Sequence, residues 1–139
     1  MPNRIEIRDL CIGYGARSKN IKTIGCHLNG CLIEGQLTCL LGANGVGKST
    51  LLKTLSGFLP KLGGNILISD NGRNGHKDIT EYSDKELAKL IGVVLTLKPD
   101  IQNMSAREMV ALGRSPYTGF WGSLGEEDNR IVDKAMEMV

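Results

Sequence analysis

Hydrophobic residues recur along this chain in short blocks whose spacing predicts both strands and helices. Polar and apolar residues alternate over residues 4–10, which is typical of a half-buried strand. The pair Asn29-Gly30 is a hairpin signal between two apolar stretches. Further strands are expected where aliphatic and β-branched residues gather, at residues 21–28, 31–33, 37–41, 65–69 and 91–95.

Helical spacing of apolar residues predicts helices between and after these strands. The first follows a glycine-rich segment at residues 42–50 and ends near Gly57, because Pro60 stops any continuation. Ser83 and Ser105 are each followed three residues later by a glutamate, which is the capping-box pattern of a helix start. The later helices are expected at residues 84–90, 105–112 and 126–139.

One segment carries a specific chemistry. Residues 42–50 read Gly42-Ala43-Asn44-Gly45-Val46-Gly47-Lys48-Ser49-Thr50, which fits the phosphate-binding pattern G-x-x-x-x-G-K-[ST]. The segment lies between a predicted strand and a predicted helix, and this order separates a working loop from a chance match. Glycines let successive N–H groups turn toward one anion, and the helix adds its positive dipole end. A glycine-rich turn with an incidental lysine is the plain alternative, but it leaves the flanking elements unexplained. We therefore expect a bound nucleoside triphosphate.

The side chains of this segment have predicted roles. Lys48 supplies a mobile positive charge for the outer phosphates and is the candidate catalytic residue. The Ser49 hydroxyl is placed to bind Mg²⁺, and Thr50 can reach the inner phosphate. The candidate nucleotide-binding residues are Tyr14, Asn44, Gly45, Val46, Gly47, Lys48, Ser49 and Thr50.

Composition bounds the remaining possibilities. The chain has 139 residues, of which 41% are hydrophobic and 4% aromatic, so one aliphatic core is expected. A net charge of +2 gives no case for nucleic-acid binding. No apolar run approaches the ~20 residues that cross a bilayer, and without an apolar signal core export is not expected. Cys11, Cys26, Cys31 and Cys39 form no C-x-x-C pair, so we expect buried reduced thiols, consistent with the cytosol.

The order of antiparallel strands before a phosphate loop resembles the ATP-binding subunit of ABC transporters over the whole chain. Ile12-Gly13-Tyr14-Gly15 is similar to the family's aromatic loop, in which the ring stacks on adenine. Gly113-Arg114-Ser115-Pro116-Tyr117 is similar to a segment common in importers of iron-siderophores, haem and cobalamin. The resemblance implies an α/β fold, a P-loop NTPase core with a mainly parallel sheet and an N-terminal antiparallel β layer. The core is expected at residues 1–95 and the beginning of a helical subdomain at 96–139.

Two departures from the family pattern bear on activity. Thr96 stands where the family has a glutamine that helps to hold Mg²⁺, so we name Thr96 as a candidate metal contact. The family's Leu-Ser-Gly-Gly-Gln segment, Asp-Glu strand end and switch histidine are not found before Val139. We therefore interpret the chain as the truncated N-terminal portion of a transport ATPase. The full-length protein is expected to hydrolyse ATP, and this chain alone is expected to be inactive.

The resemblance also implies partners and a location. Tyr117, Phe120 and Trp121 lie where family ATPases receive a helix of the membrane permease, so we favour a docking surface over a small satellite core. ATP and Mg²⁺ are the implied cofactors. The permease and a second ATPase subunit are the implied partners, at the cytoplasmic face of the membrane. Two alternatives stay open: a nucleotide-binding module without turnover, and a different P-loop enzyme such as a small kinase, which the 41 residues before the loop disfavour.

Overall fold

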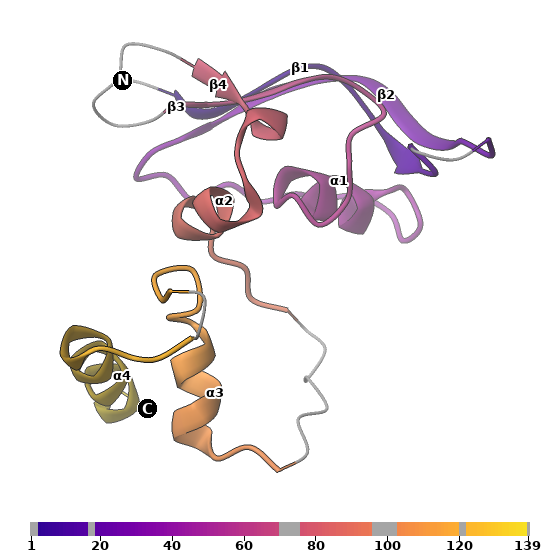
Figure 1. Cartoon of the computed structure of the whole chain (residues 1–139). Coiled ribbons are helices and arrows are strands. Elements are labelled where there is room, and N and C mark those ends of the chain that lie inside the picture. Colours follow the sequence, from indigo (N-terminus) through magenta and orange to yellow (C-terminus); the bar gives the residue numbers. More distant parts are fainter. Residues whose placement is uncertain (1–2, 17–18, 70–75, 96–102, 120–121, 139) are drawn as a thin grey trace. The chain divides into compact units, whose positions relative to one another are not determined.

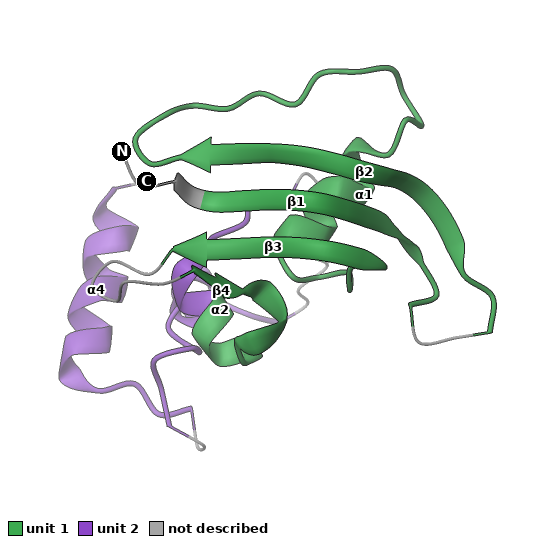
Figure 2. Ribbon diagram, turned by 90° about the horizontal axis from the view of Figure 1, so that it is seen from above, with its two compact units in different colours: residues 1–87 green, residues 88–139 purple. Residues whose placement is uncertain are grey.

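The computed structural model describes residues 3–16, 19–69, 76–95, 103–119 and 122–138. The chain divides into two compact units, Met1–Leu87 and Ala88–Val139 (Figure 2). The predicted boundary between the nucleotide-binding core (1–95) and the helical subdomain (96–139) stays a prediction.

Unit 1 is built on a four-stranded antiparallel sheet with the order β2-β1-β3-β4 (Figure 2). The strands are β1 (Asn3–Tyr14), β2 (Lys22–Ile33), β3 (Gly63–Ser69) and β4 (His76–Asp78). The helix α1 (Lys48–Leu55) lies below one face of this sheet (Figure 1). The predicted antiparallel layer is confirmed, and β4 adds a short strand beside β3.

Aliphatic side chains of β1 and β3 form the core of unit 1. Ile7, Leu10 and Ile12 of β1 are buried, and so are Ile66 and Ile68 of β3. Ile7 and Leu10 are three residues apart, whereas buried residues of a regular strand are two apart. The difference arises because the register of β1 shifts here against both β2 and β3. The shift keeps Leu10 in the core.

Asn29 and Gly30 lie inside the continuous strand β2, so the predicted hairpin turn at this pair is wrong. Asp9 and His27 have left-handed backbone angles, with φ of 47° and 56°. The Asn29 side chain accepts a hydrogen bond from the Asp9 N–H at 2.9 Å and donates one to the His27 carbonyl oxygen at 3.0 Å. Asn29 therefore stabilises a bulge between β1 and β2. The turn of this hairpin lies instead between the last residue of β1, Tyr14, and the first residue of β2, Lys22.

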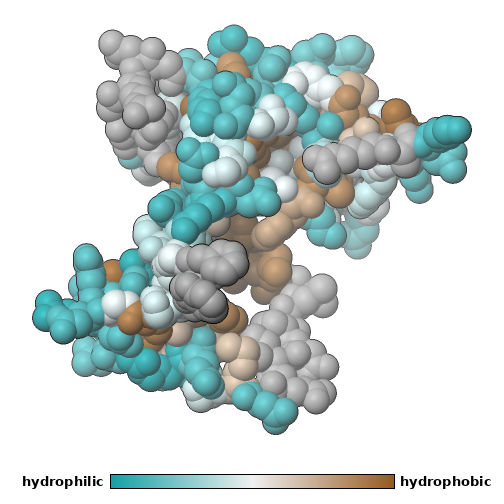
Figure 3. All heavy atoms as spheres, in the orientation of Figure 1, coloured by the Kyte–Doolittle hydropathy of each residue, from teal (hydrophilic) through white to brown (hydrophobic). Residues whose placement is uncertain are grey.

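The two segments predicted as buried parallel strands, residues 37–41 and 91–95, are irregular and largely exposed. Leu37 is 93% exposed and Val94 is 98% exposed. Exposed apolar side chains are visible in both units (Figure 3). A buried strand needs hydrogen-bonded neighbours, and neither segment pairs with another described strand. The predicted parallel core sheet is therefore wrong for the described residues, whose strand pairs are all antiparallel.

Short helices follow β4. They are the 3₁₀ helix η1 (Ile79–Glu81), α2 (Asp84–Leu90), α3 (Ala106–Leu112) and α4 (Glu126–Glu137). The helix η1 belongs to unit 1, α2 begins in unit 1 and ends in unit 2, and α3 and α4 belong to unit 2. None of the helices within the described ranges is both long and apolar enough to cross a membrane.

Both predicted capping boxes are confirmed. The Ser83 N–H donates to the Glu86 carboxylate at 2.8 Å, before α2. The Ser105 N–H donates to the Glu108 carboxylate at 2.7 Å, before α3. Each serine hydroxyl also accepts a hydrogen bond from the glutamate N–H at 3.3 Å. These reciprocal bonds satisfy backbone donors that a helix start otherwise leaves free.

Two arginine–carboxylate pairs hold α4 in unit 2. Arg107 of α3 lies 2.9 Å from Asp133, in an exposed pair. Arg114 lies 2.7 Å from Asp128, and both side chains are largely covered. The hydrogen bond from Arg114, with one from the Gly125 N–H, holds the pKa of the Asp128 carboxyl below its ordinary value. The start of α4 is thus anchored through a carboxylate that stays ionised.

The cysteines differ from their predicted state. Cys11 of β1 and Cys26 of β2 are joined by a disulfide, with their Cα atoms 4.0 Å apart. Cys31 and Cys39 are free but exposed. The prediction of four buried reduced thiols is therefore wrong. Neighbouring strands bring the first pair together, and Cys39 lies in a segment that forms no strand.

Candidate functional site

The glycine-rich loop leads into α1 through backbone conformations that favour glycine. Gly45 and Gly47 have φ of 82° and 106°, in the left-handed region. α1 begins at Lys48, directly after Gly47, which has no side chain to cap the helix. The first N–H groups of α1 can therefore donate to an anion at this end of the helix.

The Lys48 ammonium lies against this loop. Its Nζ donates to the carbonyl oxygens of Gly42 and Ala43, both at 2.7 Å. The positive charge is therefore held next to the positive end of α1. This arrangement concentrates one full charge and several amide dipoles on one short segment, which suits a polyanion.

The β1–β2 hairpin supports the loop from one side. A Cβ added at Gly47 would lie 2.7 Å from Cγ2 of Ile24 and 4.0 Å from Cδ1 of Ile12. A Cβ added at Gly45 would meet nothing within 4 Å. The loop is thus packed on aliphatic side chains at its helix end and open at Gly45. This geometry fits a phosphate chain that approaches the backbone closely.

Tyr14, at the end of β1, reaches the first turn of α1. Its hydroxyl lies 3.2 Å from the Thr50 hydroxyl oxygen. Thr50 is buried, and its carbonyl oxygen accepts a hydrogen bond from the Thr54 hydroxyl at 2.9 Å. Tyr14 itself is 44% exposed. An aromatic ring beside the loop, anchored by its hydroxyl, can stack on a flat base.

The other predicted site residues fall into two groups. Asn44, Val46 and Ser49 are exposed on the loop and the first turn of α1. Thr96, Phe120 and Trp121 lie outside the described residues, so their predicted roles stay predictions. The roles predicted for the loop side chains and for Thr50 at the phosphates also stay predictions.

Tyr117 lies in unit 2 with about half of its surface exposed. The Arg114 guanidinium is 4.0 Å from its ring centre, and the Lys89 ammonium is 5.2 Å from it. Cations at these distances are attracted to the ring. Tyr117 is therefore positioned by its own unit, and its predicted contact with a permease stays a prediction.

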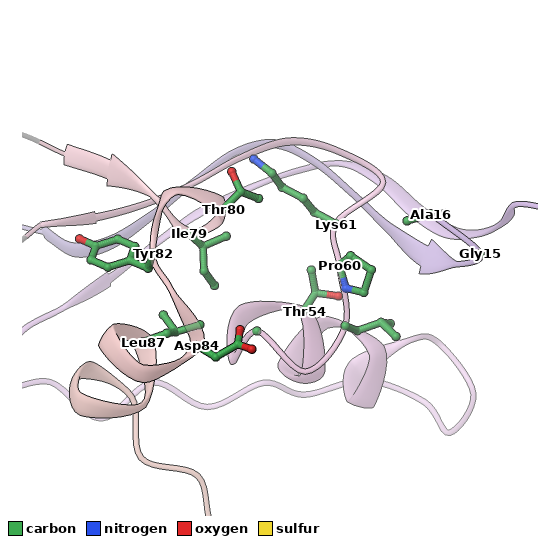
Figure 4. Close-up of a pocket in the computed structure, with 12 residues that line it drawn as sticks. Gly15, Ala16, Thr54, Pro60, Lys61, Ile79, Thr80, Tyr82, Asp84 and Leu87 are labelled. Atoms are coloured by element: carbon green, nitrogen blue, oxygen red, sulfur yellow. The ribbon is translucent and has the colours of Figure 1, made fainter. Parts of the chain in front are cut away.

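A cavity of about 600 Å³ opens in unit 1 beside the C-terminal half of α1 (Figure 4). Thr54 of α1, Pro60 of the next loop and Leu87 of α2 line it, together with Ile79 and Thr80 of η1. None of its lining residues belongs to the glycine-rich loop. We therefore do not assign this cavity to the phosphates.

Asp78 binds two residues that line this cavity, Lys61 and Thr80. Its carboxylate accepts hydrogen bonds from the Lys61 ammonium at 2.7 and 2.8 Å, from the Ile66 N–H at 3.1 Å and from the Thr80 N–H at 3.0 Å. Burial acts to raise the pKa of Asp78, but the hydrogen bonds from Lys61 and Thr80 outweigh it and hold the pKa well below 3.8. The D-x-x-E pattern that begins at Asp78 is a capping box and could have revealed this role.

A glycine loop at the start of a helix, with a lysine folded against it, defines the site of a P-loop nucleotide-binding domain. The chain belongs to the ABC transporter family, whose model matches residues 26–139. The family model confirms the resemblance that the sequence suggested.

Three relatives illustrate the match. An uncharacterised ABC transporter ATP-binding protein of Methanocaldococcus jannaschii is 35% identical over 97% of this chain and 43% of its own length. The iron(3+)-hydroxamate import ATP-binding protein of Bacillus subtilis is 34% identical, over 97% of this chain and 46% of its own length. The ferric enterobactin transport ATP-binding protein of Escherichia coli is 31% identical, over 96% and 45%. The chain thus spans less than half the length of each of these relatives.

Proposed function

We propose that this chain is the ATP-binding portion of the ATPase subunit of an ABC importer, for substrates of the iron-siderophore, haem or cobalamin kind. The loop geometry carries the nucleotide part of the proposal, above all the Lys48 ammonium held beside the N-terminus of α1. The substrate class rests on the printed functions of the Bacillus subtilis and Escherichia coli relatives.

In the proposed complex the loop amides and Lys48 hold the outer phosphates of ATP. Ser49 binds Mg²⁺, which neutralises part of the phosphate charge, and Thr96 is a further candidate contact of the metal. The ring of Tyr14 stacks on adenine while its hydroxyl stays anchored to Thr50.

The proposed partners are a membrane permease and, in the longer protein, a second ATPase subunit. Tyr117, Phe120 and Trp121 are the proposed permease contacts, and the proposed location is the inner face of the cell membrane. A nucleotide-binding module without turnover is the second candidate.

Titration with MgATP tests the binding step. Lys48→Ala removes the charge beside the loop, and we expect affinity to fall about tenfold or more, since hydrogen bonds to charged groups contribute about 1.5–3 kcal/mol. Lys53→Ala is the matched control, because Lys53 is an exposed lysine of the same helix outside the loop. We expect its affinity to stay within about twofold of the original, as for exposed charges. Equal affinities for Lys48→Ala and the unchanged protein would reject the site.

Phosphate release separates the two candidate functions. We expect negligible ATP hydrolysis by this chain alone, because a transport ATPase also needs a group that activates the attacking water. Steady turnover that persists on dilution, and that Lys48→Ala abolishes, would contradict this expectation. A longer version of the chain that binds ATP and hydrolyses it would support the importer ATPase.

A further inference from the structure

The disulfide lies where the pairing of β1 with β2 is irregular. The ladder between the two strands shifts register between Leu10 and Ile12 of β1. Cys11 stands between these two residues and is bonded to Cys26 of β2. A covalent bond therefore holds the two strands together at a step where the hydrogen-bond ladder is interrupted.

Residues close to the bonded cysteines on both strands contact the phosphate loop or the start of α1. Ile12, next to Cys11, and Ile24, two residues before Cys26, form the support beneath Gly47. Three residues beyond Cys11, Tyr14 contacts the first turn of α1. The alignment of β1 on β2 thus sets the positions of the aliphatic support and of the aromatic ring.

Small thiols can reach one end of the bond. Cys26 is exposed, whereas Cys11 is half-buried. The neighbouring His27 and Asp9 side chains, whose Nδ1 and Oδ1 atoms are 2.7 Å apart, are 83% and 70% exposed. Because thiol–disulfide exchange requires access to a sulfur atom, we expect an external thiol to attack at Cys26, the more exposed residue of the pair.

We propose that Cys11 and Cys26 form a redox modification site that tunes the affinity of the phosphate loop for nucleotide. This inference rests on the proposed nucleotide-binding function. In a reducing compartment, such as the one proposed for this protein, disulfides are usually transient and redox-sensing. The pair therefore responds to the ratio of a small thiol, such as glutathione, to its disulfide.

The exchange is balanced as follows. A small-molecule thiolate attacks Sγ of Cys26, the bond between the two cysteines breaks, and Cys11 leaves as a thiolate that takes up a proton. A second thiolate attacks the sulfur of the attached small molecule and releases Cys26 as a thiol with one molecule of small disulfide. Two electrons pass from two small thiols to the cysteine pair, and the reverse sequence reforms the bond.

The disulfide form is expected to bind nucleotide more tightly. The bond keeps the strands in register before binding, so less ordering is required when the phosphates arrive. Reduction removes the covalent link between β1 and β2 at their register shift. The aliphatic side chains that support Gly47 are then held less firmly. Linkage requires the converse as well: bound nucleotide must favour the disulfide by the same factor.

The test uses the whole chain with Cys31→Ser and Cys39→Ser, which remove the two free thiols and leave the pair as the titrating groups. The protein is equilibrated in glutathione buffers of graded ratio, with and without methylanthraniloyl-ATP and Mg²⁺. Thiol alkylation followed by mass spectrometry gives the oxidised fraction, and fluorescence gives the affinity of each form. We expect the Kd of the disulfide form to be lower by about fivefold, the lower end of ordinary coupling between sites.

Bound nucleotide should shift, by the same factor of about five, the ratio of reduced to oxidised glutathione at which half of the cysteine pair is oxidised. Cys26→Ser should bind like the reduced form and should not respond to oxidised glutathione. Equal Kd values in the two forms would overturn the coupling and leave nucleotide binding intact. Failure of both forms to bind nucleotide would overturn the proposed function, and the coupling with it. Failure of the pair to oxidise at any ratio would also overturn the inference.

Discussion

The hydroxyl groups of Tyr14 and Thr50 lie 3.2 Å apart and join the end of β1 to the first turn of α1 across 36 positions of sequence. The contact places an aromatic ring beside the phosphate loop. It also makes one residue responsible for two separable effects, because the hydroxyl anchors the helix while the ring face is available to a base.

Substitutions at Tyr14 separate these effects. Tyr14→Phe removes the hydrogen bond but keeps the ring, so we expect the unfolding free energy to fall by about 1 kcal/mol and nucleotide affinity to change little. Tyr14→Ala removes both, and affinity should fall by roughly threefold to tenfold, the range of one aromatic stacking contact. Urea denaturation and MgATP titration of the two variants test this. An equal loss of affinity in both would contradict the stacking role.

Alanine at two glycines of the loop distinguishes backbone conformation from packing. Both Gly45 and Gly47 have positive φ, but only the second lies against Ile24. Gly45→Ala should cost about 1 kcal/mol from backbone strain alone. Gly47→Ala should cost about 1–3 kcal/mol more because the added methyl group meets a packed side chain. Thermal denaturation measures both, and equal costs would show that the hairpin does not support the loop.

The Lys61–Asp78 pair should contribute far more to stability than an exposed pair does. Both side chains are largely covered, with exposed fractions of 15% and 11%. Asp78→Asn leaves a covered ammonium without its counter-charge, so we expect a loss of about 3 kcal/mol. Asp133→Asn breaks the exposed pair with Arg107 and should cost less than about 1 kcal/mol. Urea denaturation at neutral pH compares them, and equal losses would contradict the role of burial.

Asp78 also predicts the direction of acid sensitivity. Its folded-state pKa lies below the ordinary value of 3.8, so the native state holds the carboxylate more strongly than the unfolded chain does. The resulting stabilisation is complete above that ordinary value and is lost as the pH falls below it toward the folded-state pKa. Asp78→Asn should flatten this acid branch of unfolding free energy against pH. An unchanged acid branch in the variant would assign the sensitivity to other carboxylates.

Features that depend on a few neighbouring residues could be predicted from the sequence. The capping boxes at Ser83 and Ser105 follow from two side chains three positions apart, because a helix turn brings them together whatever surrounds it. The position of the phosphate loop follows in the same way from its glycines and Lys48. These interactions close within one turn of chain, so distant residues have little influence on them.

Features that depend on partners far along the chain could not be predicted in this way. Asn29 and Gly30 read as a turn, but the bulge at Asp9 uses the asparagine inside a strand. Cys11 and Cys26 read as separate thiols because their meeting depends on strand register. Residues 37–41 and 91–95 have the composition of buried strands, yet composition supplies no neighbouring strand to pair with them.

The sequence by itself thus determined the phosphate loop, the helix starts and the ABC transporter family, since each is encoded in short runs of residues. Only the tertiary structure decided that Tyr14 meets Thr50, that Ile24 packs beneath Gly47, and that unit 1 is an antiparallel sheet. The physical reason is that strand pairing and side-chain packing join residues distant in sequence, and their free energy depends on which surfaces the folded chain brings together.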